Sequence, residues 1–363
     1  MSFSDYVLQS DEKAIYSLRE LYRKHGYSHY KVSKFEEYDL YAHNKNFLVS
    51  ENILSFTDTD GKLMALKPDV TLSIVKNVDS DKAGLNKLYY NEYVYRTSAG
   101  NNGFREIMQT GLECIGKVDI FSECEVVMLA MKSLETISEN YVLDVSHMGL
   151  IQGFIELAGI APQKTSEFLS LIGAKNIPEL KAFCIANKVS ADMTESICSL
   201  AGMYLPVSEA LDHIEAIVSG EKMEKAYDEL KRIAEAMALY GLEEKLFVDF
   251  SVINDMNYYD GIIFSGFIMG IPDSVLSGGR YDRLLNKLGK NSEAIGFAVY
   301  LDRLERFGYD ENEFDIDTLV VYGEDTDMAS VIKLVGELVA DGDTVRIAAT
   351  DKEDVRYRRI IRV

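Results

Sequence analysis

The spacing of apolar residues divides the chain into a strand-rich first part, a helical middle and a second strand-rich part. Residues 10–26 repeat apolar positions at helical spacing and end at Gly26, which predicts an opening helix that Ser10 can cap. Residues 53–66 are typical of two short strands around Asp60-Gly61, which is a hairpin signal. Residues 87–96, 104–116 and 141–148 alternate as further strands.

Between these strands the pattern predicts shorter elements. Residues 30–41 are expected to be extended, and Pro68 is expected to start a short helix with Asp69 and Thr71 in its first turn. A longer helix is expected from Ser122, because Ser122 and Glu125 have the spacing of a capping box.

From about residue 151 to 240 the periodicity is helical, and strands resume at LFVDFSVI, IIFSGFIMG and AIGFAVY. The last fifty residues predict one strand, one helix and one strand, a single βαβ unit. The fold class is therefore α+β. The expected divisions are a core in two parts (residues 1–150 and 241–312), a helical insertion (151–240) and a small C-terminal βαβ unit (313–363).

Composition and charge narrow the classes of function. The net charge of −21 disfavours binding to a phosphate polymer, and the only dense basic run is the tail from Arg356 to Arg362, which is typical of a solvated end or an interaction patch. No apolar run is long enough to cross a membrane and no secretory signal opens the chain, so we expect a cytoplasmic protein. The four cysteines lack metal-site spacing and predict reduced thiols, with no metal or cofactor.

The strand over residues 107–113 carries the most informative candidate chemistry. Alternation places Gln109, Gly111 and Glu113 on one face. An amide, a gap and a carboxylate suit a small polar ligand, although a solvated sheet face has the same pattern. Other candidates are SGGRYDRLL (277–285), the tyrosine pair of NYYDG (257–261), and two arginines at element ends, Arg96 and Arg303, which fit a phosphate clamp or ordinary ion pairs. No histidine lies at motif spacing from a plausible nucleophile.

Taken in order along the chain, five segments resemble the catalytic core of class II aminoacyl-tRNA synthetases, and specifically of histidyl-tRNA synthetase. They are ALKPDVT (65–71), VYR with FREIMQTGLE (94–113), YYDGIIF (258–264), SGGRYDRLL (277–285) and AIGFAVYLDRL (294–304). The resemblance implies an antiparallel sheet of six or seven strands flanked by helices, and a dimer formed partly through the motif 1 region of the family, to which Ser33 belongs.

The resemblance also implies roles for individual residues. Asp69, Thr71 and Gln109 would hold the α-amino group of histidine, and Glu113 and Tyr259 would face its imidazole. Tyr281 matches a second pocket tyrosine of the family. Arg96 and Arg303 match the arginines that contact phosphate in these synthetases.

Several positions depart from the synthetase pattern. Asn254 stands where the family has a catalytic arginine, Ser98 where it has a glutamate, Ile107 where an aromatic ring stacks on adenine, and Ser33 where it has a proline. A neutral amide cannot replace a guanidinium at a developing anion. The anticodon-binding domain is reduced to the C-terminal unit, so no tRNA is expected.

This combination is similar to the regulatory subunits of ATP phosphoribosyltransferase, the synthetase paralogues of histidine biosynthesis. The resemblance implies a chain without catalysis of its own. Such a chain assembles as a homodimer with a short catalytic subunit and takes part in feedback inhibition by histidine as effector. The alternatives are a divergent histidyl-tRNA synthetase or other ATP-dependent amino-acid ligase, and a histidine sensor without an enzyme partner.

Overall fold

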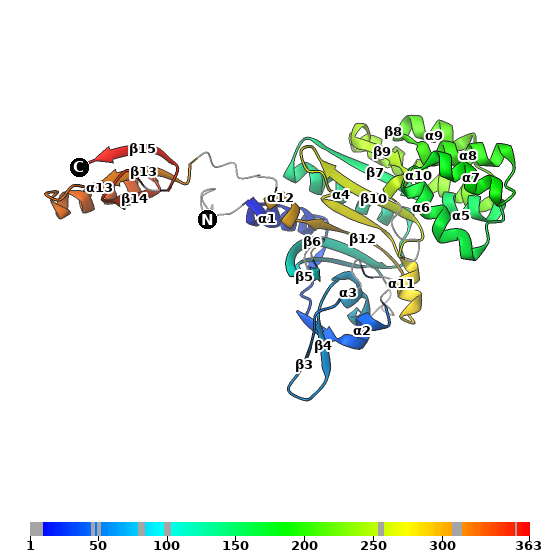
Figure 1. Cartoon of the computed structure of the whole chain (residues 1–363), viewed down its shortest axis with the longest axis horizontal. Coiled ribbons are helices and arrows are strands. Elements are labelled where there is room, and N and C mark those ends of the chain that lie inside the picture. Colours follow the sequence, from blue (N-terminus) through cyan, green and yellow to red (C-terminus); the bar gives the residue numbers. More distant parts are fainter. Residues whose placement is uncertain are drawn as a thin grey trace. The chain divides into compact units, whose positions relative to one another are not determined.

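The computed structural model of this chain describes residues 10–44, 48, 52–78, 84–97, 103–252, 258–306, 314–352 and 354–363 (Figure 1). The chain divides into two compact units, Met1–Phe307 and Gly308–Val363. The larger unit contains the strand-rich parts together with the helical middle. In the part of the chain that the structure describes, no helix is long and apolar enough to cross a membrane.

A nine-stranded sheet forms the centre of the larger unit. Its strands lie in the order β1 (Ser28–His29), β5 (Asn86–Thr97), β6 (Phe104–Gly116), β12 (Glu293–Tyr300), β11 (Leu276–Arg280), β10 (Ile262–Ile268), β7 (Tyr141–His147), β9 (Leu246–Asp249) and β8 (Tyr204–Pro206). The strands from β5 to β7 in this order pair antiparallel, but β1 lies parallel to β5 and β9 parallel to β7. The sheet is therefore larger than expected and mixed, because the helices between β7 and β9 form a crossover that returns the chain in the same direction.

One face of this sheet is covered by α4 (Ile120–Ile137), which packs on β7, β10 and β12, and by α1 (Ser10–Lys24), which packs on α4. The prediction that Ser122 caps α4 was wrong. The cap is Asp119, whose carboxylate accepts a hydrogen bond from the backbone N–H of Ser122 at 2.9 Å. The opposite face of the sheet carries the pocket that is described below.

A separate three-stranded sheet has the order β2 (Phe35–Glu37), β4 (Leu63–Leu66) and β3 (Ser55–Thr57). The expected hairpin is present, but the expected extended segment ends at Glu37, because Tyr38–Ala42 forms the short helix α2. The next helix, α3 (Thr71–Asn77), begins after Pro68 rather than at it. The Asp69 carboxylate accepts from the N–H of Leu72 at 2.8 Å and so occupies the start of the helix.

A buried ion pair joins this small sheet to the large one. Lys67 follows β4, its side chain is 0% exposed, and its Nζ lies 2.5 Å from Glu92 Oε2 on β5. The other carboxylate oxygen of Glu92 accepts from the N–H of Val32 at 3.0 Å. Because the Lys67 side chain is buried, water cannot solvate its ammonium group if Glu92 is removed.

The helical insertion consists of α5 (Met148–Leu157), α6 (Thr165–Gly173), α7 (Ile177–Ala186), α8 (Ala191–Gly202), α9 (Val207–Glu215) and α10 (Glu221–Leu239). These helices gather at the β8 and β9 edge of the sheet, drawn in green in Figure 1. The insertion also contributes strand β8 to the sheet. Lys175, between α6 and α7, has a left-handed φ of 50° and pairs with Asp249 of β9 at 2.9 Å, which ties the insertion to the sheet.

The C-terminal unit has one more strand than the sequence predicted. Strands β13 (Ile316–Val321), β14 (Val345–Ala348) and β15 (Tyr357–Arg362) form a parallel sheet in the order β14-β13-β15, and α13 (Met328–Ala340) connects β13 to β14. The basic tail forms strand β15 and is therefore part of the fold.

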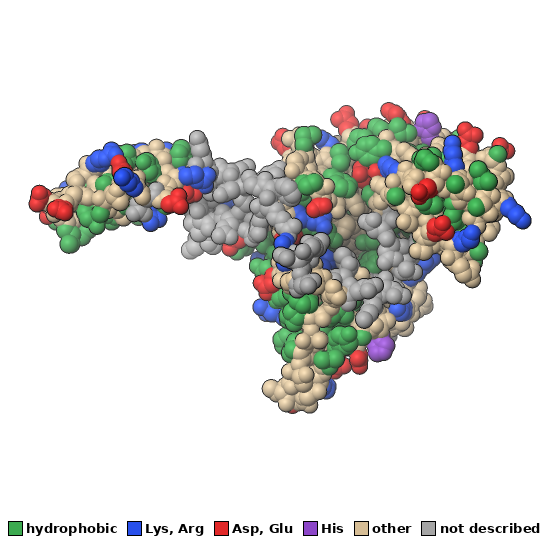
Figure 2. All heavy atoms as spheres, viewed as in Figure 1, with side chains coloured by type: hydrophobic (Ala, Val, Ile, Leu, Met, Phe, Trp, Pro, Cys, Tyr) green, Lys and Arg blue, Asp and Glu red, His purple; other side chains and the backbone are tan. Residues whose placement is uncertain are grey.

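Each tail arginine pairs with an aspartate of the same unit: Arg356 with Asp315, Arg358 with Asp317, Arg359 with Asp343 and Arg362 with Asp351. Figure 2 shows acidic and basic side chains intermixed on this unit. These pairings compensate the positive charge of the tail locally, which weakens its interpretation as an interaction patch.

We expect Lys67→Ala to lower the free energy of unfolding by about 3–5 kcal/mol, because it leaves the Glu92 carboxylate without its counter-charge. Replacing both residues, Lys67→Met with Glu92→Leu, is expected to restore most of the loss. Urea unfolding measures both effects. Lys62→Ala is the control, since Lys62 pairs with Glu37 while 65% exposed and should cost less than about 1 kcal/mol. Equal losses in Lys67→Ala and Lys62→Ala would contradict the assignment.

Candidate functional site

A cavity of about 450 Å³ opens on the sheet face opposite α4. All eight residues that the sequence singled out for a ligand line it, although they come from distant parts of the chain. They are Asp69, Thr71, Arg96, Gln109, Glu113, Tyr259, Tyr281 and Arg303. Their roles toward a ligand remain predictions, but the structure brings them together.

Glu113 lies at the centre of the site, 1% exposed, on strand β6. Thr71 of α3 donates a hydrogen bond from Oγ1 to Glu113 Oε1 at 2.6 Å, and the Tyr281 hydroxyl donates to Oε2. The carboxyl group is therefore held in one orientation from two sides. Gly296 on the neighbouring strand makes room for it, since a Cβ at that position would lie 1.9 Å from Glu113 Oε2.

The pKa of Glu113 is raised to about 8, chiefly by burial and to a smaller extent by the nearby charge of Asp69. The hydrogen bonds from Thr71 and Tyr281 act in the opposite direction, because they stabilise the ionised form. Near neutral pH the carboxyl is thus poised between two states. When protonated it can donate to a ring nitrogen, and when ionised it accepts from one or pairs with a cation.

A second carboxylate belongs to Asp69, which lies two residues before the first residue of α3. The Arg96 guanidinium approaches it, with Nη2 at 3.9 Å from Asp69 Oδ2, and donates from Nε to the backbone oxygen of Pro68 at 2.8 Å. Burial raises the pKa of Asp69, whereas the charge of Arg96 and the backbone N–H groups of α3 lower it. Arg96 therefore supports the segment that carries Asp69.

Gln109 carries a buried amide nitrogen that the described part of the protein does not satisfy. It is 2% exposed on β6, and its Nε2 finds no hydrogen-bond partner among the described residues. A buried donor without a partner costs free energy, which a ligand oxygen would recover. Gln109 thus marks a place in the cavity for an acceptor.

Three tyrosines form the aromatic wall of the cavity. The ring of Tyr258 lies 4.6 Å from that of Tyr259 and 5.7 Å from that of Tyr281, measured between centroids. Gly279 leaves space for this wall, since a Cβ there would lie 2.7 Å from Tyr259 Cδ1. Flat rings beside a carboxyl group suit a planar, partly polar ligand group.

The other end of the cavity is lined by hydroxyl groups and Arg303, which lies in the short helix α12 (Asp302–Arg306). Arg303 donates from Nη1 to Ser274 Oγ at 3.2 Å, and its guanidinium lies 4.4 Å from the centre of the Tyr300 ring. The Tyr300 hydroxyl is hydrogen-bonded to Ser277 Oγ at 2.7 Å. Arg303, like Arg96, already has protein partners.

Sequence reasoning missed several lining residues. Tyr258 belongs to the tyrosine pair, but only Tyr259 was assigned to the pocket. Tyr90 was not identified either, and it occupies the gap that Gly111 was expected to leave for a ligand. A Cβ at Gly111 would lie 2.6 Å from the Tyr90 hydroxyl oxygen. The strand alternation that places Tyr90 and Tyr300 on the pocket face was available in the sequence, but only the pairing order reveals which face is covered by α4.

Two of the departures from the synthetase pattern, Ser98 and Asn254, lie outside the described residues. Ile107 is described, half-buried beside the apolar cluster around α3. Ser33 donates a hydrogen bond from Oγ to the backbone oxygen of Phe35 at 2.7 Å.

Comparison with known proteins places this fold and pocket in a family. The family model described as histidyl-tRNA synthetase matches residues 8–304. A protein of Clostridium kluyveri named ATP phosphoribosyltransferase regulatory subunit is 30% identical over 85% of this chain and 81% of its own length.

Two solved structures share the fold. One is an ATP phosphoribosyltransferase regulatory subunit/histidyl-tRNA synthetase from Bacillus halodurans, with a TM-score of 0.77, 21% identity and coverage of 97% of this chain and 93% of its own. The other is the ATP phosphoribosyl transferase (HisG:HisZ) complex from Thermotoga maritima, with a TM-score of 0.63, 17% identity and coverage of 83% and 98%. The chain belongs to the histidyl-tRNA synthetase-like family and, within it, to the ATP phosphoribosyltransferase regulatory subunits.

We expect Glu113→Gln to change the pH dependence of stability. In the folded protein Glu113 holds its proton to about pH 8, whereas in the unfolded chain it ionises near pH 4.5. Between these values the folded state binds more protons, so the free energy of unfolding falls as pH rises. Urea unfolding at pH 5, 6, 7 and 8 should show a shallower fall in the variant, by up to about 1.4 kcal/mol per pH unit.

The comparison isolates Glu113, because other buried acids contribute equally to both proteins. One of these is Asp144, where burial raises the pKa to about 7. Parallel curves for the wild type and Glu113→Gln would contradict the prediction.

Proposed function

We propose that this chain is a non-catalytic regulatory subunit of ATP phosphoribosyltransferase. In this role it supports a short catalytic subunit in the first step of histidine biosynthesis, in the cytoplasm, and takes part in feedback inhibition by histidine. The observation that carries the proposal is that all eight predicted ligand residues line one cavity around the Glu113 carboxyl group, which two hydrogen bonds hold in place. Membership of the regulatory-subunit family supports the same role.

The chemistry of the pocket fits histidine as the ligand. Asp69 supplies a carboxylate for an α-ammonium group. The resemblance assigns Gln109 to the same group, but the donor that the structure leaves without a partner, Gln109 Nε2, suits the carboxylate of the amino acid instead. Glu113 can exchange a hydrogen bond with an imidazole nitrogen in either protonation state. The ring of Tyr259 lies beside the same space, so the imidazole would have an apolar surface as well as a polar partner.

Two observations support the lack of a catalytic role. The cavity arginines have protein partners, and the sequence lacks the catalytic arginine of the family. Arg96 is engaged by Pro68 and Asp69, and Arg303 by Ser274 and Tyr300. Both arginines therefore have structural partners, as expected if they no longer bind ATP. The family's catalytic arginine is replaced by Asn254.

We further propose that the chain forms a homodimer within a hetero-oligomer with the catalytic subunit and does not bind tRNA. Support for a dimer comes from the small sheet, where Phe35 of β2 and Phe56 of β3 are 49% and 37% exposed. Their ring centroids lie 5.8 Å apart across the central strand β4. Exposed aromatic rings that pack together suit a protein contact better than solvent.

The experiment that tests the function is reconstitution with a purified short catalytic chain. Phosphoribosyl transfer to ATP should require both chains and should be inhibited by histidine, and light scattering of the complex should give the number of copies. This chain alone should show no histidine-dependent exchange between ATP and pyrophosphate. Measurable exchange would support the synthetase alternative instead, and failure to bind the catalytic chain would support a stand-alone sensor.

Glu113→Ala should weaken histidine binding by about 10- to 100-fold while leaving assembly with the catalytic chain intact, because it removes a hydrogen bond to a charged or polarised ring. Titration calorimetry measures the affinity and gel filtration the assembly. Glu106→Ala, an exposed glutamate on the same strand, is the control and should leave affinity unchanged. An unchanged affinity in Glu113→Ala would count against the pocket.

A further inference from the structure

Arg280, the last residue of strand β11, and Tyr281, which follows it, point to opposite sides of the sheet. Arg280 lies on the side of α4, where it contacts Glu123, whereas Tyr281 lines the amino-acid pocket. The pocket tyrosine thus follows directly after a charged residue that does not enter the pocket. Its position depends on the backbone at this turn, and therefore on what holds Arg280 and the residues after Tyr281.

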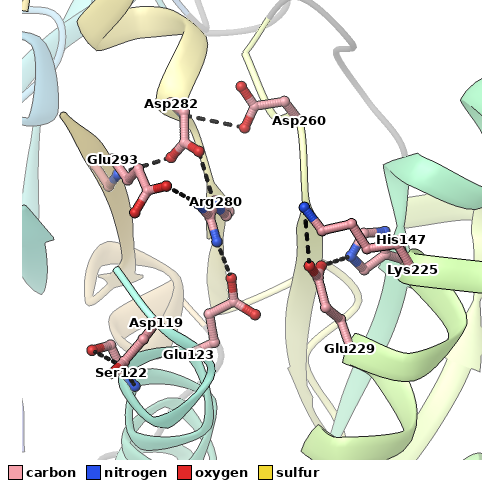
Figure 3. A network of polar contacts seen from close by, with 11 residues as sticks. Asp119, Ser122, Glu123, His147, Lys225, Glu229, Asp260, Arg280, Asp282 and Glu293 are labelled. Carbon is pink, nitrogen blue, oxygen red and sulfur yellow. Dashed lines mark hydrogen bonds and ion pairs between the residues drawn. The ribbon is translucent and has the colours of Figure 1, made fainter. Parts of the chain in front are cut away.

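Arg280 is the centre of a network of carboxylates (Figure 3). Its guanidinium lies 2.5 Å from Glu123 of α4, 2.9 Å from Asp282 and 3.0 Å from Glu293 of β12. Glu123 is 2% exposed, so this pairing is made away from water. Only the planar guanidinium offers donors in several fixed directions, which a lysine ammonium cannot reproduce.

Two aspartates connect this network to the backbone around the pocket. Asp282 opens α11 (Asp282–Lys287) and accepts from the N–H of Ala294 at 2.9 Å. Asp260 accepts from the N–H groups of Asp282 and Arg283 at 3.1 and 2.8 Å, and its own N–H donates to the oxygen of Arg280 at 3.0 Å. The segments that precede and follow the pocket tyrosines are therefore tied to each other.

Arg280 also borders a second cavity, and its stem packs against Gly261. This cavity has a volume of about 570 Å³, and α5 and α10 line it on the other side. Figure 3 shows Glu229 and His147 across from the network, hydrogen-bonded to each other at 2.8 Å. Gly261 leaves room for the stem of Arg280, since a Cβ there would lie 2.9 Å from Arg280 Cδ.

Several carboxylates around one largely buried guanidinium contribute little to the free energy of unfolding, because the cost of desolvating the charges offsets their attraction. The directional effect of the network is better defined. It fixes the backbone on both sides of Tyr281, whose N–H donates to the oxygen of Ala294 at 2.9 Å and whose hydroxyl donates to Glu113.

We propose that Arg280 is a positioning residue of the amino-acid pocket, which holds the turn at Tyr281 so that the tyrosine hydroxyl meets Glu113. Arg280 itself contacts no ligand. The part of this proposal that concerns ligand affinity rests on the proposed function, whereas the part that concerns Glu113 rests on the contacts of the pocket alone.

The first test needs no ligand. The pKa of Glu113 can be followed by carbon-13 NMR of its carboxyl group, assigned by its absence in Glu113→Gln. Tyr281→Phe should raise this pKa, because the hydrogen bond from Tyr281 lowers it in the wild type. Arg280→Gln should raise it too, and Arg280→Lys should do so less. Adding Tyr281→Phe to Arg280→Gln should produce little further change.

This double-mutant comparison separates positioning from two simpler effects. Loss of a distant positive charge, or general loosening, would add to the effect of Tyr281→Phe instead of replacing it. Additive shifts, or an unchanged Glu113 pKa in Arg280→Gln, would overturn the proposal. Arg232→Gln is the control, because the Arg232 side chain forms an ion pair with Asp228 on the exposed surface of α10. If Arg280→Gln does not fold, Arg280→Lys and Gly261→Ala provide the same comparison.

The second test measures histidine affinity by calorimetry. Arg280→Gln and Tyr281→Phe should each weaken binding by about 3- to 10-fold, and the double variant by no more than either one. Equal affinity in Arg280→Gln and wild type would contradict the role in binding. If the wild type does not bind histidine while the Glu113 pKa responds as expected, the proposed function fails and the positioning role stands.

Discussion

Burial of the Glu113 carboxyl group is the constraint on which the pocket depends. A carboxyl group that is 1% exposed requires donors, and Thr71 and Tyr281 supply them from two elements that are far apart in the sequence. It also requires space, which Gly296 leaves on the adjacent strand. The positions of α3 and of the turn after β11 are thus coupled through one side chain, and movement of either would leave a buried acid without its partner.

The supports of the pocket lie outside it. Lys67 and Glu92 join the small sheet to β5, and so fix the start of α3 relative to the sheet face that carries Glu113. Arg96 holds the segment before α3 through the backbone oxygen of Pro68. On the other side, Asp260 joins the two segments that carry the pocket tyrosines. The charged groups of Lys67, Arg96 and Asp260 thus bind other parts of the protein, and these contacts hold the pocket in place.

Local signals in the sequence predicted most strands of the sheet, and alternation placed Gln109 and Glu113 on one face. The resemblance to histidyl-tRNA synthetases implied that all eight candidate residues belong to one ligand site, and all eight line the cavity. The sequence did not predict β9 parallel to β7, since that pairing depends on the crossover through the insertion. It missed strand β15 because its arginines pair with aspartates that are distant in sequence, such as Asp315 and Asp343. Tyr90 was missed for a related reason. Strand β5 has tyrosines that point to both faces of the sheet, and only the position of α4 shows which face carries the cavity.

The departures from the synthetase pattern can be understood from the way in which the charges of the cavity arginines are compensated. A site that activates an amino acid needs free cations at the place where negative charge develops, and such cations repel each other in the absence of substrate. A site that only senses an amino acid has no such need. In this chain Arg96 and Arg303 have protein partners, and under the proposed function the specificity for histidine rests on Glu113, Asp69 and Gln109. Because the pKa of Glu113 is raised to about 8, a small change in its donors alters its protonation near neutral pH. The protonation of Glu113 is therefore coupled to the hydrogen bonds from Thr71 and Tyr281.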